Sequence, residues 1–186
     1  MFSHPLGGDA ALRLVSMGDA EMLFALVDAN RVYLRQWLPW VAGTTHVDHT
    51  KRWIEGALRQ YATNDGFEAG ICLDGQIVGI LGLNRINWAN RSANIGYWLG
   101  EAFQGRGIVS MACQAVTSYA FSALNLNRVE IRAATMNHRS RAIPKRLNFE
   151  HEGTLREAEW LGDRFVDHEV YAMLAKHWLI PPVSQT

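Results

Sequence analysis

A short loop at residues 104–109 has the composition and surroundings of a phosphate-binding site. An extended, largely apolar run at residues 93–99 precedes it, and from about Gly105 onward apolar residues recur at helical spacing. Small residues at a strand-to-helix junction let a ligand approach the backbone, and the N–H groups of the first helical turn attract an anion. The loop is therefore a candidate pyrophosphate site, although the same glycines would suit an ordinary turn. It matches neither a Walker loop nor the G-x-G-x-x-G dinucleotide pattern.

Basic side chains cluster at one other place, formed by Arg139, Arg141, Lys145 and Arg146. The whole chain carries 18 basic and 18 acidic side chains, so its formal net charge is zero. This balance disfavours a protein that binds nucleic acid or an anionic membrane through bulk charge. The cluster is typical of a solvated helix face, but beside a phosphate loop it could also hold a further phosphate.

The remaining composition excludes several classes of protein. Cys72 and Cys113 lie far apart in apolar segments, which predicts reduced thiols and a cytoplasmic location. The seven histidines are not at metal-ligand spacing, so we expect no metal. We find neither a signal-peptide pattern nor an apolar run long enough to span a membrane. We expect a single domain over residues 1–186, with its core at about 11–179.

Periodicity and turn signals place the elements that must position these residues. The order favours an α/β fold with a mixed sheet and helices on both faces. Residues 1–9 are expected to be a loose lead-in. The predicted elements are a strand at 11–15, a helix from the Ser16/Asp19 capping pair to about 29, a short helix ending near Pro39, a helix capped by Asp48, strands at 67–73 and 76–86 around the Asp74-Gly75 turn, a strand at 91–99, the helix from Gly105, a strand at 128–135, a helix at 138–147, and strands at 150–157 and 164–174 around Gly162.

Two segments, in order along the chain, carry the motifs of a known family. The loop fits the pattern Q/R-x-x-G-x-G/A at Gln104 and Gly107. Residues 134–149 fit the pattern N-x-x-S-x-x-x-x-x-x-x-G-F at Asn137, Ser140 and Phe149. Both motifs resemble those of the GNAT N-acetyltransferase superfamily, in which the first binds acetyl-CoA.

The chain departs from these motifs at two positions. Val109 replaces the last small residue of the first motif, and Asn148 stands where the second usually has glycine. Asparagine is the non-glycine residue that best tolerates a left-handed backbone, so the second change is compatible with the motif. Residues 34–40 further resemble a segment of the RimL/RimJ-like branch, which acetylates the N-termini of ribosomal proteins. The likeness runs from about residue 12 to residue 179.

The resemblance implies a mostly antiparallel sheet with one parallel pair, formed by the strand ending at Leu99 and the strand starting at Arg128. Where these strands splay apart, exposed backbone groups could pair with the pantetheine arm of acetyl-CoA. The loop would then hold the pyrophosphate, and Arg139 another phosphate. The expected cofactor-binding residues are Trp98, Leu99, Gln104, Gly105, Arg106, Gly107, Ile108, Val109, Asn137, Arg139 and Ser140.

Acetyl transfer from a thioester to an amine needs an oxyanion donor, a proton donor to the thiolate and a proton acceptor for the amine. We expect a backbone N–H among residues 97–99 to be the first, and Ser140 to be the second, with Tyr97 as an alternative. Many relatives carry a glutamate where this chain has Asn94, which cannot accept a proton. Among the remaining carboxylates we select Glu68 as the base; the others considered are Glu101, Glu130 and Glu152.

The acceptor site is expected across the sheet from the cofactor, lined by Trp37, Trp40 and His168. An α-amine has a pKa near ~8 and lysine one near ~10.4, so lack of a strong base favours an α-amine. The N-terminus of a ribosomal protein is the favoured acceptor. A small amine, such as a polyamine, an antibiotic or an amino acid, is an alternative, as is a non-catalytic acyl-CoA sensor. A homodimer is expected, because two-fold dimers are common among soluble proteins and the relatives often dimerise.

Overall fold

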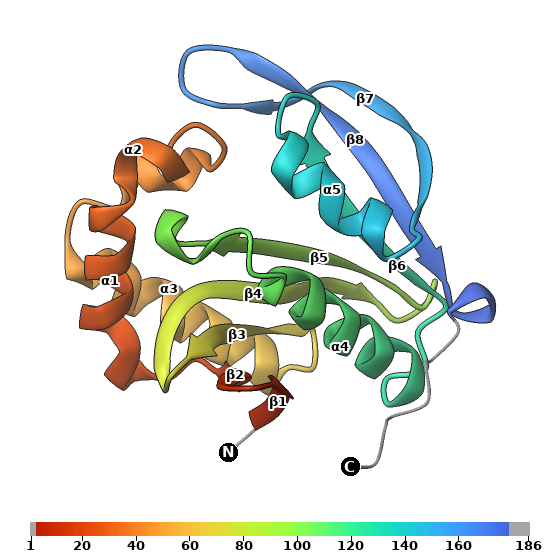
Figure 1. Ribbon diagram of the computed structural model, residues 1–186, viewed down its shortest axis with the longest axis horizontal. Helices are drawn as coiled ribbons and strands as arrows, with labels where there is room; N and C mark the ends of the chain where they lie inside the picture. The colour runs from red at the N-terminus through yellow and green to blue at the C-terminus, as the bar shows by residue number, and fades with distance from the viewer. Residues whose placement is uncertain (1–2, 179–186) are drawn as a thin grey trace.

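The computed structural model describes residues 3–178 and places one eight-stranded sheet at the centre of the fold (Figure 1). The strands lie in the order β1-β2-β3-β4-β5-β6-β8-β7, and the only parallel neighbours among them are β5 and β6. The mixed sheet predicted from the sequence is therefore confirmed. The bounds are β1 Ser3–Gly7, β2 Ala10–Leu14, β3 Gly66–Leu73, β4 Gln76–Asn87, β5 Ser92–Leu99, β6 Arg128–Ala134, β7 Glu150–Trp160 and β8 Phe165–Leu174; α1 Ala20–Ala29, α2 Arg31–Leu34, α3 Val47–Ala62, α4 Ile108–Ser122 and α5 His138–Arg146; and the 3₁₀ helices η1 Met17–Asp19, η2 Pro39–Gly43, η3 Glu101–Phe103 and η4 Ala175–His177.

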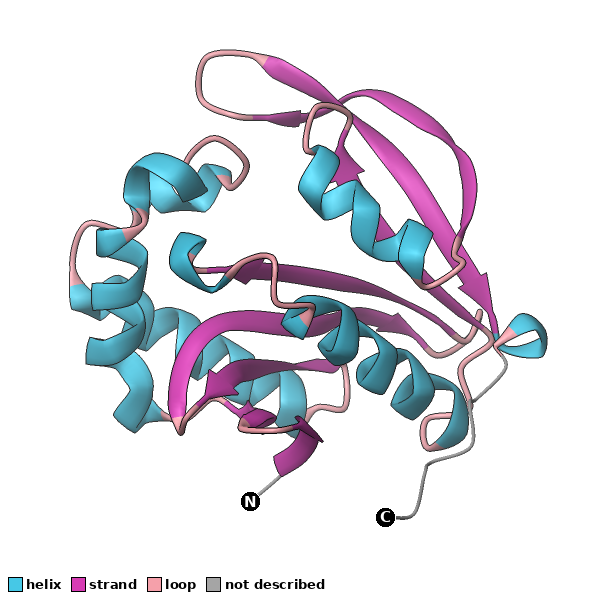
Figure 2. Cartoon of the chain, viewed as in Figure 1, coloured by secondary structure: helices cyan, strands magenta, loops and turns pink. Residues whose placement is uncertain are grey.

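Helices cover both faces of the sheet, as Figure 2 shows. On one face, Val116 of α4 shares a buried cluster with Leu83 of β4. On the opposite face, Leu23 of α1 and Ile54 of α3 pack against Ile80. Because successive strand side chains point to opposite faces, each strand residue can be assigned to one of them. We call the face covered by α4 and α5 the α4 face. We call the opposite face, covered by α1 and α3, the α1 face.

The parallel pair opens part-way along its length. Residues 92–95 of β5 pair with residues 128–131 of β6. Beyond Ile95, β5 remains bound to β4, and beyond Ile131, β6 remains bound to β8, so the two strands diverge (Figure 1). Their facing edges at residues 96–99 and 132–134 present backbone groups that a ligand or water can satisfy. The predicted splay is confirmed.

Several local predictions are also confirmed. Asp74 and Gly75 have φ values of 50° and 77°, as the two-residue turn between antiparallel strands requires. Ser16 and Asp19 form the predicted capping box. Asn148 adopts the left-handed backbone expected of it, with φ 58°. Within residues 3–178, no helix has the length and apolarity needed to cross a membrane.

Other boundaries were wrong. The expected loose lead-in contains β1, which pairs with β2 and is recognisable only from that pairing. The helix expected from Gly105 begins at Ile108, because Gly107 has a left-handed backbone with φ 75°. The cap of α3 is His46, whose ring accepts from the N–H of Asp48, so Asp48 lies in the first turn.

The region around Pro39 also differs from the expectation. α2 ends at Leu34, and Pro39 begins the 3₁₀ helix η2 instead of ending a helix. The residue before the proline, Leu38, is extended as predicted, with φ −127° and ψ 104°. In addition, β7 continues to Trp160, three residues past its predicted end. The predicted core boundary at residue 179 lies outside the described residues.

Candidate active site

A cavity of about 940 Å³ lies where β5 and β6 diverge. It is bounded by the start of α4, by α5, by the α2–η2 segment and by the ends of β7 and β8. Every site residue predicted from the sequence lines it, with the exception of Glu68. These lining residues are Trp37, Trp40, Tyr97, Trp98, Leu99, Gln104, Gly105, Arg106, Gly107, Ile108, Val109, Asn137, Arg139, Ser140 and His168.

The start of α4 offers the cavity an anion-binding surface. Ile108, Val109 and Ser110 line the cavity, and their N–H groups precede the first intrahelical bond, from the N–H of Met111 to the carbonyl of Gly107 at 3.1 Å. Gly105 and Gly107 both have positive φ, and a Cβ on either would meet no atom within 4 Å. The loop is therefore open to a ligand, and the positive end of α4 faces that opening.

The predicted basic cluster does not form a single surface. Arg139 donates to Gln104 Oε1 at 2.7 Å, and Arg146 donates to Ser110 Oγ at 2.7 Å. Both therefore contact residues 104–110, which we call the α4 loop, and both line the cavity. Arg141 turns toward the sheet, where it donates to the carbonyl of Thr135 at 2.6 Å and to Tyr171 Oη at 3.2 Å. Of the cluster, the described contacts bring only Arg139 and Arg146 to the cavity.

The two candidate proton donors are in contact with each other. Ser140 Oγ donates to Tyr97 Oη at 3.1 Å, and Tyr97 Oη donates to the carbonyl oxygen of Ser140 at 3.0 Å. Asn137 caps α5 by accepting from the N–H of Ser140 at 3.1 Å, which fixes the serine in the first turn. Burial raises the pKa of Tyr97 well above its ordinary value, so its phenol stays protonated.

Glu68 lies on the α1 face of β3, with one strand, β4, between it and the cavity lining on β5. It is directly opposite Gly82 of β4, which is opposite Gly96 of β5, and Gly96 lines the cavity. A Cβ placed on Gly82 would lie 2.5 Å from Glu68 Oε2, so the carboxyl group extends over that glycine. Burial raises the pKa of Glu68 to about 7, against the opposing effect of a hydrogen bond from Asn84.

The two glycines leave room over β4 for the Glu68 carboxyl and for the Asn84 amide, whose Nδ2 would lie 2.6 Å from a Cβ on Gly82 and 3.7 Å from one on Gly96. The Asn84 amide therefore stands between the Glu68 carboxyl and the cavity at Gly96. Neighbouring strands are about 4.8 Å apart, so the carboxyl over Gly82 is about one strand spacing from Gly96. Asn94, at the position where many relatives have glutamate, lies opposite Asn84 on the same face and is not a lining residue.

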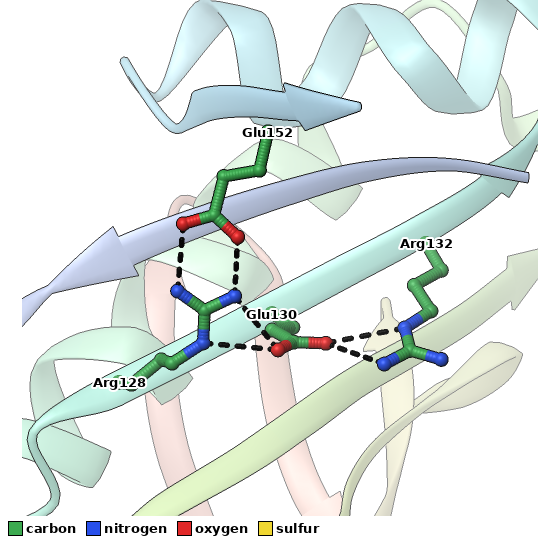
Figure 3. Close-up of polar contacts among 4 residues, drawn as sticks. All are labelled: Arg128, Glu130, Arg132 and Glu152. Atoms are coloured by element: carbon green, nitrogen blue, oxygen red, sulfur yellow. Dashed lines mark hydrogen bonds and ion pairs between the residues drawn. The ribbon is translucent and has the colours of Figure 1, made fainter. Parts of the chain in front are cut away.

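Two other carboxylates weighed from the sequence are engaged in an ion-pair ladder (Figure 3). Arg128 donates to both Glu152 and Glu130, and Arg132 donates to Glu130 Oε2 at 2.8 and 3.1 Å. Burial favours the neutral acid of Glu130, but these hydrogen bonds prevail and lower its pKa below the ordinary value. Both groups therefore stay ionised and paired, which makes them poor proton acceptors.

Two charged cavity residues were missed by the sequence reasoning. Glu159 accepts at 3.2 Å from, or shares a proton with, His168 Nε2, and both line the cavity. Arg132 lines the same wall. Glu159 lay beyond the predicted end of β7, and an irregular register between Leu155 and Glu159 hides its strand from the alternation pattern. For Arg132 the alternation in residues 128–132 was the available signal.

Across the cavity from Glu159 and His168, the α2–η2 segment forms an aromatic wall. Trp40 is 42% exposed and lies with its ring centre 6.0 Å from that of Trp98. Arg31 secures this wall because its guanidinium donates to the carbonyls of Val41 and Thr44, both at 2.7 Å. Within residues 3–178, no group of three or more His, Cys, Asp or Glu residues is arranged to hold a metal ion.

Comparison with known proteins agrees with this geometry. The model of the acetyltransferase (GNAT) domain matches residues 10–150. The "Putative ribosomal N-acetyltransferase YdaF" of Bacillus subtilis (strain 168) is 36% identical over 96% of this chain and 98% of its own. The ribosomal-protein-serine acetyltransferase of Escherichia coli (strain K12) is 30% identical over 88% and 91%. The solved structure of RimL, a ribosomal L7/L12 α-N-protein acetyltransferase in complex with coenzyme A, has a TM-score of 0.90 at 29% identity, covering 93% of this chain and 98% of that one. The chain belongs to the GNAT family and is an acetyltransferase.

Proposed function

We propose that this acetyltransferase moves the acetyl group of acetyl-CoA directly to the N-terminal α-amine of a ribosomal protein. One observation carries the proposal: a single cavity lies between β5 and β6, with the start of α4 and two arginines of α5 on the α4 face and with aromatic side chains, Glu159, His168 and Arg132 on the α1 face. Tyr97 and Ser140 lie on the α4 face, whereas Trp98 packs toward α1 and α2. Cofactor and acceptor can thus reach one point from opposite faces of the sheet.

The residues on the α4 face fit coenzyme A. The free N–H groups of Ile108, Val109 and Ser110 suit its pyrophosphate, and Arg139 and Arg146 suit its remaining phosphate charge. The facing edges of β5 and β6 at residues 96–99 and 132–134 can pair with the amides of an extended arm. Bound in this way, acetyl-CoA supplies a thioester carbonyl at the gap.

The chain's own groups then handle the charges of the transfer. A backbone N–H among residues 97–99 stabilises the oxyanion, and Ser140 protonates the departing sulfur as the new carbon–nitrogen bond replaces the carbon–sulfur bond. Tyr97 orients Ser140 and is the alternative donor, since its phenol stays protonated. Cys113 is buried within α4, and burial raises the pKa of its thiol, so it is no candidate for a covalent acyl intermediate.

The amine loses its proton to Glu68 through water beside Gly96, next to the Asn84 amide that lies over Gly82. A carboxyl with a pKa of about 7 is well matched to an α-amine with a pKa near ~8. The Glu159–His168 pair holds the amine from the other side of the gap, where both side chains line the cavity. Trp37 and Trp40 form the remaining wall for the first residues of the acceptor.

The setting of the enzyme is also part of the proposal. Residues 1–186 form one domain, and both cysteines are buried free thiols, which suits the reducing cytoplasm. A homodimer and an absence of nucleic-acid binding remain predictions, which sedimentation and RNA titration at several salt concentrations would check.

The deciding experiment is a titration with acetyl-CoA and CoA by calorimetry, followed by thiol-release assays with N-terminal peptides and with small amines. Binding with turnover on peptides supports the proposal. Turnover on small amines alone identifies a small-molecule acetyltransferase, and binding without any turnover identifies an acyl-CoA sensor. For a variant of the loop before α4, Gly107→Ala, the matched control is Gly43→Ala, where a Cβ meets no atom within 4 Å and φ is not positive.

A further inference from the structure

The α1 face of the cavity contains a cation that the proposed transfer does not use. Arg132 lies on β6 at the first position after the pairing with β5 ends, and it lines the cavity. The other arginines of the lining, Arg106, Arg139 and Arg146, belong to the α4 loop and to α5. Among the described residues, Arg132 is therefore the one arginine of the cavity lining that lies on a strand, and it points to the α1 face.

The ion-pair ladder fixes the position of this guanidinium. Glu130 accepts from Nε and Nη2 of Arg132, and is itself held by Arg128, which Glu152 of β7 anchors. Figure 3 shows the third nitrogen of Arg132 turned away from Glu130. That nitrogen has no partner among residues 3–178, and the side chain is 45% exposed. The ladder thus orients Arg132 and leaves one edge of its fork for a ligand.

The neighbouring charges define what that ligand is. Arg132 is paired with Val170 across β6 and β8, and Ala134 with His168, so Arg132 and His168 are diagonal neighbours on one face. Diagonal neighbours are about 7–8 Å apart. His168 and Glu159 form the pair proposed to hold the acceptor amine. The other charged groups near this side of the cavity are the ladder, Glu68 and Glu101, whose N–H donates to Asn30 Oδ1 at 2.8 Å.

We propose that Arg132 recognises an acidic side chain at the second or third residue of the acceptor peptide. An extended chain advances about 3.3 Å per residue, so the second and third residues of an acceptor held at His168 come within reach of a side chain whose strand position is about 7–8 Å from His168. The substrate class is then a protein N-terminus with an aspartate or glutamate close behind its first residue. This inference rests on the proposed transfer to an α-amine.

The test compares three peptides that begin with serine and differ only at positions 2 and 3, which are both Asp, both Ala or both Lys. We expect wild-type kcat/KM to be about tenfold higher for the Asp peptide than for the Ala peptide, and lowest for the Lys peptide. Arg132→Gln should abolish this preference, and Arg132→Glu should reverse it in favour of Lys. Calorimetric binding of the Nα-acetylated peptides with CoA present should follow the same order without turnover.

Arg52→Gln is the matched control, since Arg52 is an exposed residue of α3 that does not line the cavity. It should leave the melting temperature and the preference for Asp unchanged. Equal acetylation of the three peptides by the wild type, or a preference that survives Arg132→Glu, would overturn the role of Arg132 while leaving the transfer to α-amines intact. Binding of acetyl-CoA with no turnover on any of the peptides would instead refute the proposed function.

Discussion

Replacing Glu68 by glutamine should separate the catalytic role of this carboxyl from its cost to stability. In the folded protein, the carboxyl lies over Gly82, and burial raises its pKa from 4.5 to about 7. Below pH 7 the Glu68 carboxyl of the wild type is protonated and cannot accept the amine proton. The kcat of the wild type should therefore fall about tenfold for each unit of pH below 7. Glu68→Gln should lower kcat by about 10²–10⁴ and remove this acidic limb.

The same pKa sets the size of the stability effect. Because the folded pKa lies above the unfolded one, this group stabilises the fold fully below pH 4.5, and its contribution is lost as the pH rises through 7. At about 1.4 kcal/mol per factor of ten, the difference amounts to about 3 kcal/mol as an upper bound. Glu68→Gln should therefore raise the melting temperature by several degrees at pH 8, and by much less at pH 4.5.

The assay is a pH series of kcat and of melting temperature for the wild type, Glu68→Gln, Glu159→Gln and a control, Glu55→Gln. Glu55 is an exposed residue of α3. The control should match the wild type in both measurements. Glu159→Gln should raise the KM of the acceptor, because Glu159 is proposed to hold the amine, and it should keep the acidic limb.

Two results would refute the reasoning in different places. An acidic limb that survives Glu68→Gln and disappears in Glu159→Gln would move the base to the Glu159–His168 pair. A melting temperature of Glu68→Gln that parallels the wild type between pH 4.5 and 8 would show that the pKa of Glu68 is not raised.

Four further substitutions test other parts of the site. Gly82→Ala should push the Glu68 carboxyl aside and lower kcat at least tenfold with little change in melting temperature, because the added Cβ meets only the flexible ends of side chains; unchanged kcat would exclude the route across this glycine. Ser140→Ala should lower kcat more than it weakens acetyl-CoA binding, and an equal kcat would remove the hydroxyl from the mechanism. Gly107→Ala should destabilise the fold by about 1 kcal/mol because its φ is 75°, and calorimetry should show weaker acetyl-CoA binding if the α4 loop holds the pyrophosphate. Arg31→Lys should raise the KM of the acceptor and leave the affinity for acetyl-CoA unchanged, since the lost hydrogen bonds secure only the aromatic wall.

Local signals in the sequence predicted most elements and, together with the family resemblance, most of the residues that line the site. The Asp74-Gly75 turn, the capping box at Ser16 and the apolar periodicities are properties of a few adjacent residues, and each of these predictions depends on such a short range. The splayed parallel pair was predicted from the family resemblance instead. The α4 loop is of the same kind, because its glycines and the helix that follows are contiguous. Boundaries failed where a neighbour in space decided them, as for β1, which is a strand because β2 pairs with it.

The acceptor half of the site was decided by the tertiary structure. Residue order alone cannot show that the row Glu68–Gly82–Gly96 crosses three strands, nor that Glu159 meets His168, since antiparallel register sets both. Strand register also selects which carboxylates remain available: Arg128 engages Glu130 and Glu152 in ion pairs, whereas Glu68 is buried beside glycine and keeps a raised pKa. The sequence by itself determined the chemical groups and the local elements that carry them. Only the packing of distant strands determined which of those groups share a cavity, because burial and pairing are properties of the folded neighbourhood.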